Sequence, residues 1–265
     1  MTDHLLVTKE NGIATITMNR PEARNALSLE MREGLFLAVT DIETDDSVRC
    51  VVIKGAGDHF MAGGDVKSFN DFVNKTPEER RQNFERRIHN LHPTMFTLQR
   101  MNKPVIASVQ GAAAGFGLSL MMACDMVIAA EDAFFTLAYI GIATTPDGSG
   151  THSLPRIVGL KKAMEIAMLG DRFGTEAARE MGMINFVVPK DELSAETDKL
   201  ASRLAKGPTF ALGRTKALLN ASLGNSMESQ LSLEAQSFAA CAASDDWVEG
   251  VKAFKEKRKP EFKGK

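Results

Sequence analysis

Cysteine is scarce in this sequence. The 265 residues include three cysteines, Cys50, Cys124 and Cys241, which lie far apart and form no CxxC pair. An odd number of widely spaced cysteines argues against a disulfide framework. The five histidines are scattered, so no metal-ligand spacing is present either. We therefore expect a protein without a metal site, working in a reducing compartment.

An excess of positive charge and long apolar runs are missing too. The formal net charge is −2, whereas affinity for a phosphate backbone requires a clear excess of Lys and Arg. No stretch approaches the roughly 18 apolar residues of a membrane span. The N-terminus also lacks a basic region followed by an apolar run. These absences argue against nucleic-acid and membrane partners and favour a soluble, cytoplasmic protein.

Two nucleotide-binding fingerprints are absent as well. The glycines at 111, 115 and 117 have the wrong spacing for GxGxxG, and GxxxxGK[ST] does not occur. The sequence therefore gives no reason to expect a dinucleotide cofactor or a P-loop.

The N-terminal half alternates strand and helix patterns. Apolar and β-branched runs at 4–9 and 13–18 flank Asn11-Gly12, and both turn residues tolerate positive φ, so this region predicts a hairpin. Ser28 can cap a helix over 29–43. Further strands are expected at 48–55, 104–109 and 126–130. This rhythm predicts an α/β layered core.

After about residue 150 the pattern becomes helical. A short strand is expected within 184–188, followed by long helices near 190–205, 208–222, 226–242 and 244–256. The segment 66–80 is polar and loop-like, and a long irregular stretch in a compact domain is more often functional than idle. We expect it to flank a site.

Two glycine-rich turns follow strands and can present backbone N–H groups to a ligand. HFMAGGDV at 59–66 comes after the strand at 48–55, and the turn at 111–117 precedes a helix-forming run at 118–124. Backbone N–H groups at such a helix N-terminus favour negative charge. Two N–H groups from separate strand ends, meeting at one thioester carbonyl oxygen, would stabilise an enolate by a few kcal/mol per donor.

Six segments, in chain order, resemble those of one known family. They are NRPEARNAL at 19–27, FMAGGDV at 60–66, QGAAAGFGLSLMMACD at 110–125, PDGSGTHSLPRIVG at 146–159, AREMGMINFVV at 178–188 and EGVKAFKEKRKPEF at 249–262. Together they cover nearly the whole chain and are similar to the crotonase (enoyl-CoA hydratase/isomerase) family. The resemblance is closest to its Δ3,Δ2-enoyl-CoA and 1,2-epoxyphenylacetyl-CoA isomerase members.

The resemblance implies a fold, a substrate and an assembly. The expected fold is α/β, a spiral core of ββα units over 1–200 that holds the CoA and acyl site. A helical segment over 201–265 would serve oligomerisation and complete the CoA site. The expected substrate is an acyl-CoA thioester, with coenzyme A as part of the substrate rather than a cofactor, and the expected assembly is a homotrimer or homohexamer.

The resemblance also implies site residues. Gly64 and Phe116 match the two oxyanion donors, which act through their backbone N–H groups. Lys257 matches a phosphate contact that the family often receives from a neighbouring subunit. The remaining positions expected to contact CoA or the acyl group are Ala23, Arg24, Ala62, Gly63, Asp65, Val66 and Tyr139.

The sequence departs from the hydratases of the family, which hold a water between two glutamates. The corresponding residues here are Ser119 and Tyr139, and neither hydroxyl is a good base at neutral pH. Asp147 instead occupies the position of the catalytic aspartate in several family isomerases. The resemblance thus implies a double-bond isomerase, in which Asp147 removes an α-proton and returns it at C4.

Alternatives remain open at this point. Asp147 is also a natural helix cap before Gly-Ser-Gly-Thr, and His92, which precedes Pro93, is expected to end a helix. His92, Tyr139 and Asp147 resemble positions in 4-chlorobenzoyl-CoA dehalogenases, although those have tryptophan where Tyr139 stands. Ordinary enoyl-CoA hydration and a silent acyl-CoA-binding or RNA-binding member are further alternatives. A Ser-His-Asp hydrolase built from Asp147, Ser149 and His152 is not expected, because they lie within six residues.

Overall fold

The computed structural model describes residues 3–265, and in it the chain begins with the expected hairpin. Strands β1 (Leu5–Glu10) and β2 (Ile13–Met18) pair antiparallel across Asn11 and Gly12. Both turn residues have left-handed backbone, with φ of 53° and 78°. Asparagine and glycine tolerate this conformation, so the local sequence determines the turn.

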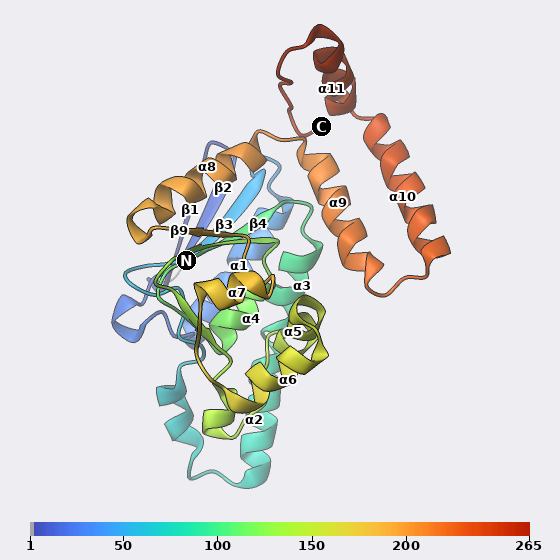
Figure 1. Ribbon diagram of the computed structural model, residues 1–265. Helices are drawn as coiled ribbons and strands as arrows, with labels where there is room; N and C mark the ends of the chain where they lie inside the picture. Colours follow the sequence, from blue (N-terminus) through green and yellow to red (C-terminus); the bar gives the residue numbers. More distant parts are fainter. Residues whose placement is uncertain (1–2) are drawn as a thin grey trace.

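A six-stranded sheet organises the core (Figure 1). Its order is β1-β2-β3-β4-β6-β9, and every pair beyond the hairpin is parallel. The added strands are β3 (Cys50–Gly55), β4 (Val105–Val109), β6 (Met126–Ala130) and β9 (Phe186–Val188). β4 is buried throughout, as expected for a parallel strand covered on both faces. The expected α/β fold is confirmed, and β3, β4 and β9 are one or two residues shorter than the sequence predicts.

A second, small sheet has no counterpart in the sequence prediction. It consists of β5 (Ala112–Ala114), β7 (Phe134–Thr136) and β8 (Phe173–Gly174), in the order β5-β7-β8. Strands of two or three residues are too short to show an alternating pattern. A bridge between Met61 and Ala113 joins this sheet to the first glycine-rich segment. The small sheet therefore brings the two glycine turns side by side.

Helices cover both faces of the large sheet. α1 (Leu29–Thr44) begins at its expected cap, where the Ser28 Oγ accepts a hydrogen bond from the Met31 N–H at 3.1 Å. α1, α3 (His92–Arg100) and the fully buried α4 (Phe116–Met122) contribute to the main core cluster. α8 (Leu193–Ala205) closes the opposite face. The remaining helices of the core are α5 (Gly150–Val158), α6 (Leu160–Leu169) and α7 (Thr175–Glu180).

The loop expected at 66–80 is only partly a loop. A 3-10 helix runs over Val66–Phe72, and helix α2 begins at Pro77 and continues to His89. A capping box of Thr76 and Glu79 begins α2, and its residue spacing is a known sequence signal. The Thr76 hydroxyl accepts a hydrogen bond from the Glu79 N–H, while the Glu79 carboxylate accepts one from the Thr76 N–H. Neither helix has a fully buried residue. Because α2 buries no side chain completely, its sequence is polar, and this polarity led to the wrong prediction of a loop.

Three long helices project from the core at the C-terminal end (Figure 1). They are α9 (Thr209–Ser222), α10 (Met227–Ala242) and α11 (Asp245–Glu256), all close to their expected ranges. The boundary expected at 200 falls inside α8, which packs on the sheet, so the separation in packing comes after Ala205. Within residues 3–265, none of the helices has the length and apolarity to traverse a bilayer.

Candidate active site

The two glycine turns approach each other closely. Gly63 has φ of +96° and Gly115 has φ of +53°. A Cβ atom at Gly63 would lie 3.0 Å from the Ala114 carbonyl oxygen and 3.5 Å from the Phe116 nitrogen. Glycine is therefore required at position 63 both by its backbone conformation and by its neighbours.

The N–H groups of Gly64 and Phe116 are available to a ligand. Among residues 3–265, neither donates a hydrogen bond to the protein, although the neighbouring Leu27 and Asp65 N–H groups both do. Phe116 is the first residue of α4, so its N–H carries the partial positive charge of the helix end. Both residues line the same cavity. The arrangement suits an oxyanion site.

The cavity has a volume of about 1170 Å³ and adjoins both turns. Its walls come from the start of α1, the glycine turns, the 3-10 helix, α2, the start of α3 and the segment 137–151. Apolar side chains dominate the walls, and a small number of polar groups lie among them. Such a site fits an acyl thioester, which combines an apolar chain with one polarisable carbonyl.

Asp147 is half-buried in this cavity wall and does not cap a helix. The residue before α5 is Ser149, and no side-chain cap is present there. The Tyr139 hydroxyl donates to Asp147 Oδ1 at 2.5 Å. Burial raises the pKa of Asp147, and the bond from Tyr139 and the charge of His92 partly offset this rise. The carboxylate is thus more basic than an exposed aspartate.

Ser119 and Tyr139, which stand where hydratases have glutamates, support Asp147. The Ser119 Oγ donates to the Asp147 backbone carbonyl oxygen at 2.8 Å. Burial, followed by the negative charge of Asp147, raises the pKa of Tyr139 far above its usual range. Neither hydroxyl is a base at neutral pH, so among the three positions 119, 139 and 147 only Asp147 has a side chain that can accept a proton.

His92 begins a helix rather than ending one, so that expectation was wrong. It is the first residue of α3, and it lines the cavity together with Tyr139 and Asp147. No hydrogen bond joins His92 to Asp147 among the described residues. His152 is exposed, and its neighbour Asp147 is bonded to Tyr139, so a Ser-His-Asp triad is not formed.

The segment 19–27 acts mainly through its backbone and one buried amide. The Asn25 side chain is fully buried, accepts from the Arg20 N–H and donates to the carbonyl oxygens of Ala56 and His59. This amide holds the two loops together, a role that the sequence did not reveal. Ala23 and Arg24 are not in the cavity lining, whereas Ala62, Gly63 and Val66 are.

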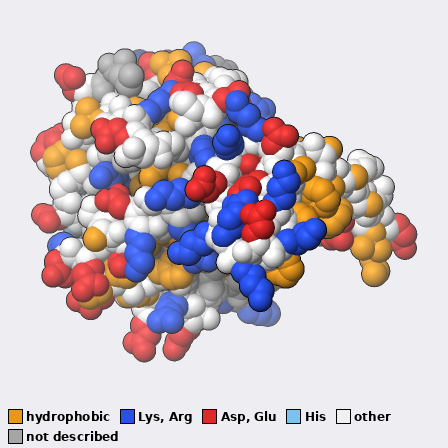
Figure 2. All heavy atoms as spheres, turned by 90° about the horizontal axis from the view of Figure 1, so that it is seen from above, with side chains coloured by type: hydrophobic (Ala, Val, Ile, Leu, Met, Phe, Trp, Pro, Cys, Tyr) orange, Lys and Arg blue, Asp and Glu red, His pale blue; other side chains and the backbone are white. Residues whose placement is uncertain are grey.

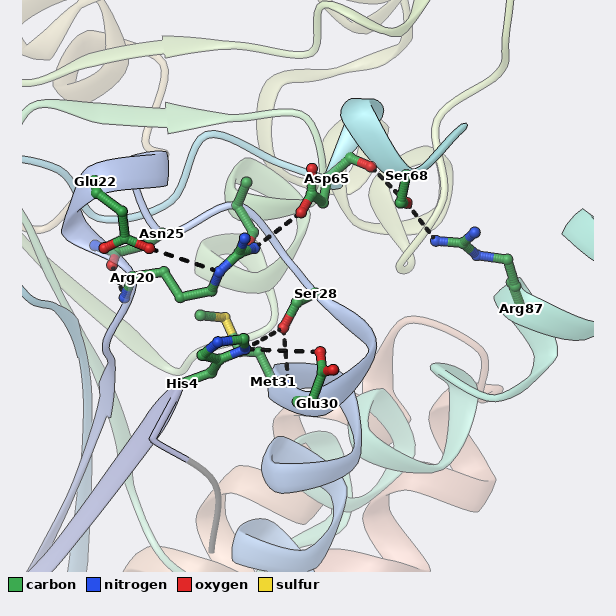
Figure 3. A network of polar contacts seen from close by, with 11 residues as sticks. His4, Arg20, Glu22, Asn25, Ser28, Glu30, Met31, Asp65, Ser68 and Arg87 are labelled. Atoms are coloured by element: carbon green, nitrogen blue, oxygen red, sulfur yellow. Dashed lines mark hydrogen bonds and ion pairs between the residues drawn. The ribbon is translucent and has the colours of Figure 1, made fainter. Parts of the chain in front are cut away.

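Asp65 is engaged within the protein. Figure 3 shows the Arg20 guanidinium reaching the Asp65 carboxylate, with Arg20 Nη1 3.0 Å from Asp65 Oδ2. Ala62 donates its N–H to the Arg24 carbonyl oxygen at 2.9 Å. The acidic residue of the AGGD segment therefore fixes the turn, and its carboxylate is paired within the protein rather than offered to a substrate.

An aromatic cluster with an arginine forms the wall on the α2 side. The Arg87 guanidinium lies over the rings of Phe69, Phe72 and Phe84, and its Nη2 donates to the Ser68 Oγ at 3.1 Å (Figure 3). Sequence reasoning missed all of these residues. Their spacing in a segment thought to be a loop gave no sign that they converge.

Lys257 is remote from this cavity within one chain. It lies at the C-terminal end of α11 with a left-handed backbone, and within residues 3–265 nothing after Thr151 lines the cavity. A contact between Lys257 and coenzyme A, if made from a neighbouring subunit, stays a prediction.

Comparison with known proteins agrees with this geometry. Residues 8–265 match the family model described as enoyl-CoA hydratase/isomerase. The chain is 38% identical, over the full length of both proteins, to a 1,2-epoxyphenylacetyl-CoA isomerase of Escherichia coli K12. It is 35% identical to a crotonyl-CoA hydratase of Syntrophomonas wolfei, with 98% of each chain covered.

Solved structures show the same fold. An enoyl-CoA hydratase from Polaromonas sp. JS666 superposes with a TM-score of 0.91 at 33% identity, covering 98% of this chain and 99% of that one. An enoyl-CoA hydratase from Mycobacterium smegmatis gives 0.90 at 33% identity, with 98% of each chain covered. The sheet, the glycine turns and the full-length matches together establish that this chain belongs to the enoyl-CoA hydratase/isomerase family, with the crotonase fold expected from its motifs.

Proposed function

We propose that the protein is an acyl-CoA double-bond isomerase in which Asp147 is the acid and base. One observation carries the proposal. The resemblance to the family points to positions 119, 139 and 147 as the places for proton-transfer groups, and only position 147 has a carboxylate side chain. The half-buried Asp147 shares one cavity with the N–H groups of Gly64 and Phe116.

The reaction would be a proton shift within the acyl chain. The thioester carbonyl oxygen accepts hydrogen bonds from the Gly64 and Phe116 N–H groups, which stabilise negative charge as it develops. Asp147 removes the proton from the α-carbon of a 3-enoyl thioester, and the carbonyl oxygen becomes an enolate. The protonated Asp147 then delivers a proton to C4, and the double bond ends between C2 and C3. One carboxylate serves both steps, so no second acid is needed.

Relatives named as hydratases and relatives named as isomerases both match nearly the whole chain, so the assignment depends on the site residues. Water addition to a 2-enoyl thioester requires a base that holds the water and an acid that protonates the α-carbon. Ser119 is bonded to the Asp147 carbonyl oxygen, and the raised pKa of Tyr139 keeps its hydroxyl protonated. These features favour proton transfer by Asp147 alone.

The first test follows 3-enoyl-CoA and 2-enoyl-CoA in heavy water with the wild type and with Asp147→Asn. We expect the wild type to move the double bond and to incorporate deuterium. The amide cannot accept the proton, so the variant should lose on the order of 10²- to 10⁴-fold in kcat/KM. Double-bond position and deuterium content are read by NMR and mass spectrometry.

Undiminished isomerisation by Asp147→Asn would contradict the proposal. Preferred water addition by the wild type would assign the protein to the hydratases despite Ser119 and Tyr139. A matched control is His152→Asn, because His152 is exposed and lies outside the cavity lining on the same stretch of chain. It should retain wild-type rates.

The assembly belongs to the same proposal. We propose a homotrimer, or a hexamer made from two of them, in which Lys257 of one subunit contacts the coenzyme A phosphates held by the next. Exposed apolar side chains on the three C-terminal helices support association, since large exposed apolar patches mark interaction sites. Coenzyme A stays attached to the acyl group throughout this scheme, so it is part of both the substrate and the product rather than a cofactor.

A further inference from the structure

Three arginines line the cavity without a carboxylate partner. Arg32 comes from α1, and Arg80 and Arg87 come from α2. Within residues 3–265, none of the three has an acidic oxygen within 4 Å. Arginine stays protonated in proteins, so this wall of the cavity carries uncompensated positive charge.

The acidic groups of the same cavity are already engaged. The Asp65 carboxylate pairs with Arg20, outside the arginine set, at 3.0 Å. Glu85 pairs with Arg81 on the outer surface of α2 at 2.9 Å. Asp147 accepts its hydrogen bond from the tyrosine described above. Within residues 3–265, no carboxylate therefore forms a direct ion pair with the arginine wall.

Arg87 is held in place for binding. Its guanidinium carbon lies 5.3 Å, 5.8 Å and 5.5 Å from the ring centres of Phe69, Phe72 and Phe84. One N–H bond to Ser68 fixes the direction of the group. Stacking of this kind uses the face of the guanidinium, and its remaining in-plane N–H groups stay available for the two oxygens of a carboxylate.

Arg32 adds a second positive charge to the same cavity wall. Its Nη1 lies 3.4 Å from the Arg87 carbonyl oxygen. Burial, and then the repulsion by Arg32, lowers the pKa of Arg87 despite the opposing effects of Asp65 and Asp71. Like charges that line one partly buried wall repel each other, and an anion that binds at this wall would relieve the repulsion.

The arginine wall lies close to the thioester site. The Ser68 hydroxyl that accepts from Arg87 itself donates to the Asp65 carbonyl oxygen at 2.7 Å. The Phe69 ring lies 3.5 Å from the position of a Cβ at Gly64. Two consecutive hydrogen bonds through Ser68 therefore connect Arg87 to Asp65, the residue that follows the oxyanion donor Gly64.

From this geometry we propose that Arg32 and Arg87 form a carboxylate subsite, and that the acyl group carries a second carboxylate at its far end. The substrate class would be CoA thioesters of short dicarboxylic acids. The inference rests on the proposed acyl-CoA substrate. The phosphates of coenzyme A are the other possible source of oxyanions, but the whole length of pantetheine separates them from the thioester, whereas Arg87 is linked through Ser68 to the residue that follows the oxyanion donor Gly64.

The test measures binding of saturated thioesters by calorimetry, because these ligands cannot be isomerised. Adipyl-CoA is compared with hexanoyl-CoA, and glutaryl-CoA with pentanoyl-CoA, so that each pair differs in one terminal group. We expect the wild type to prefer the dicarboxylic member. Arg87→Met and Arg32→Met should each reduce that preference by roughly 10- to 100-fold, the usual effect of losing a charged hydrogen bond.

Arg86→Met is the matched control. Arg86 is exposed on the same helix and does not line the cavity, so removing its charge should leave the preference unchanged. Circular dichroism and the unfolding temperature identify a variant that fails to fold. Because Arg32 and Arg87 lie on different helices, the inference can still be tested with one variant if the other does not fold.

Two results would overturn the inference. A wild type that binds both members of each pair equally well excludes a carboxylate subsite. An equal loss of affinity for every thioester and for free coenzyme A would show that the arginines bind the phosphates instead. Because no turnover is involved, either result leaves the proposed isomerase reaction to be judged separately, by the Asp147→Asn experiment in heavy water.

Discussion

At the scale of single residues, the oxyanion site depends on backbone rather than side chains. Gly64 does not have a left-handed backbone, and a Cβ there would meet only the end of the Phe69 ring at 3.5 Å, an ordinary contact. Gly63 differs, because its positive φ and the nearby Ala114 carbonyl oxygen exclude a side chain. Glycine is thus required at position 63 by conformation and space, whereas position 64 has room for a Cβ atom.

This difference gives a prediction at position 64. Gly64→Ala keeps the N–H donor and should retain activity within a few fold. Gly64→Pro removes the donor and should lower kcat by on the order of 10²- to 10³-fold, with a smaller effect on KM. Steady-state kinetics on one enoyl-CoA measures both variants, and equal activity of the two would show that Gly64 is not an oxyanion donor.

Tyr139 sets the ionisation of Asp147. Its hydrogen bond stabilises the carboxylate and so lowers a pKa that burial has raised. Tyr139→Phe removes this bond, so the pKa of Asp147 should rise further. The base form would then be lost at a higher pH, and the acidic limb of the pH profile of kcat/KM should move toward alkaline pH.

Ser119→Ala is the comparison for this change. The Ser119 hydroxyl bonds to the backbone of Asp147 rather than to its carboxylate, so the acidic limb should move less than in Tyr139→Phe. Equal shifts in the two variants would mean that the tyrosine does not control the carboxylate.

At the scale of elements, helix α2 is the part of the site held most weakly. It contributes no fully buried side chain, and its N-terminus depends on the capping box of Thr76 and Glu79. It nevertheless forms one wall of the cavity, through Phe84, Arg87 and Ile88. Elements with few buried contacts open locally at lower free energy than the core.

Removal of the Thr76 cap should therefore destabilise α2 more than the rest of the protein. Thr76→Ala should cost about 1 kcal/mol of helix stability. We expect faster amide hydrogen exchange over 77–89 and an almost unchanged global unfolding temperature. Ser226→Ala removes the corresponding cap of α10, where the Ser226 Oγ accepts from the Ser229 N–H, and should leave the amides of α2 unaffected. Unchanged exchange in α2 after Thr76→Ala would show that tertiary contacts, not the cap, hold this helix.

At the scale of the whole molecule, the C-terminal helices present apolar surface to solvent. Figure 2 shows hydrophobic side chains gathered on the projecting part of the molecule. Phe254 is 86% exposed and Phe238 is 74% exposed. Other large exposed apolar residues of α9, α10 and α11 are Leu219, Met227, Leu231, Leu233, Trp247, Val248 and Val251. Solvent exposure on this scale is unfavourable for a monomer.

Introducing charge there should break the assembly. Phe238→Glu and Phe254→Glu are expected to shift the protein toward monomer, because a desolvated unpaired carboxylate is costly at an interface. Sedimentation velocity measures the change. Leu6→Glu makes the same substitution at an exposed residue of β1 and should leave the assembly intact. A monomeric wild type at micromolar concentration would contradict the proposed oligomer.

Local signals in the sequence were sufficient for much of this protein. Asn11-Gly12 determines a hairpin, Ser28 determines the start of α1, and the helical pattern after about residue 150 predicts α9 to α11, because each depends on neighbours a few positions away. The ordered motifs determined the family and therefore the fold.

Only the tertiary structure decided which side chains meet. Tyr139 reaches Asp147, Arg20 occupies the Asp65 carboxylate, and Arg32 and Arg87 come from separate helices to one wall. These contacts depend on the path of the chain in space, which no local spacing encodes. The motifs alone identify a site that stabilises an enolate, whereas the side chains brought together by the fold give that site its base and its charged wall.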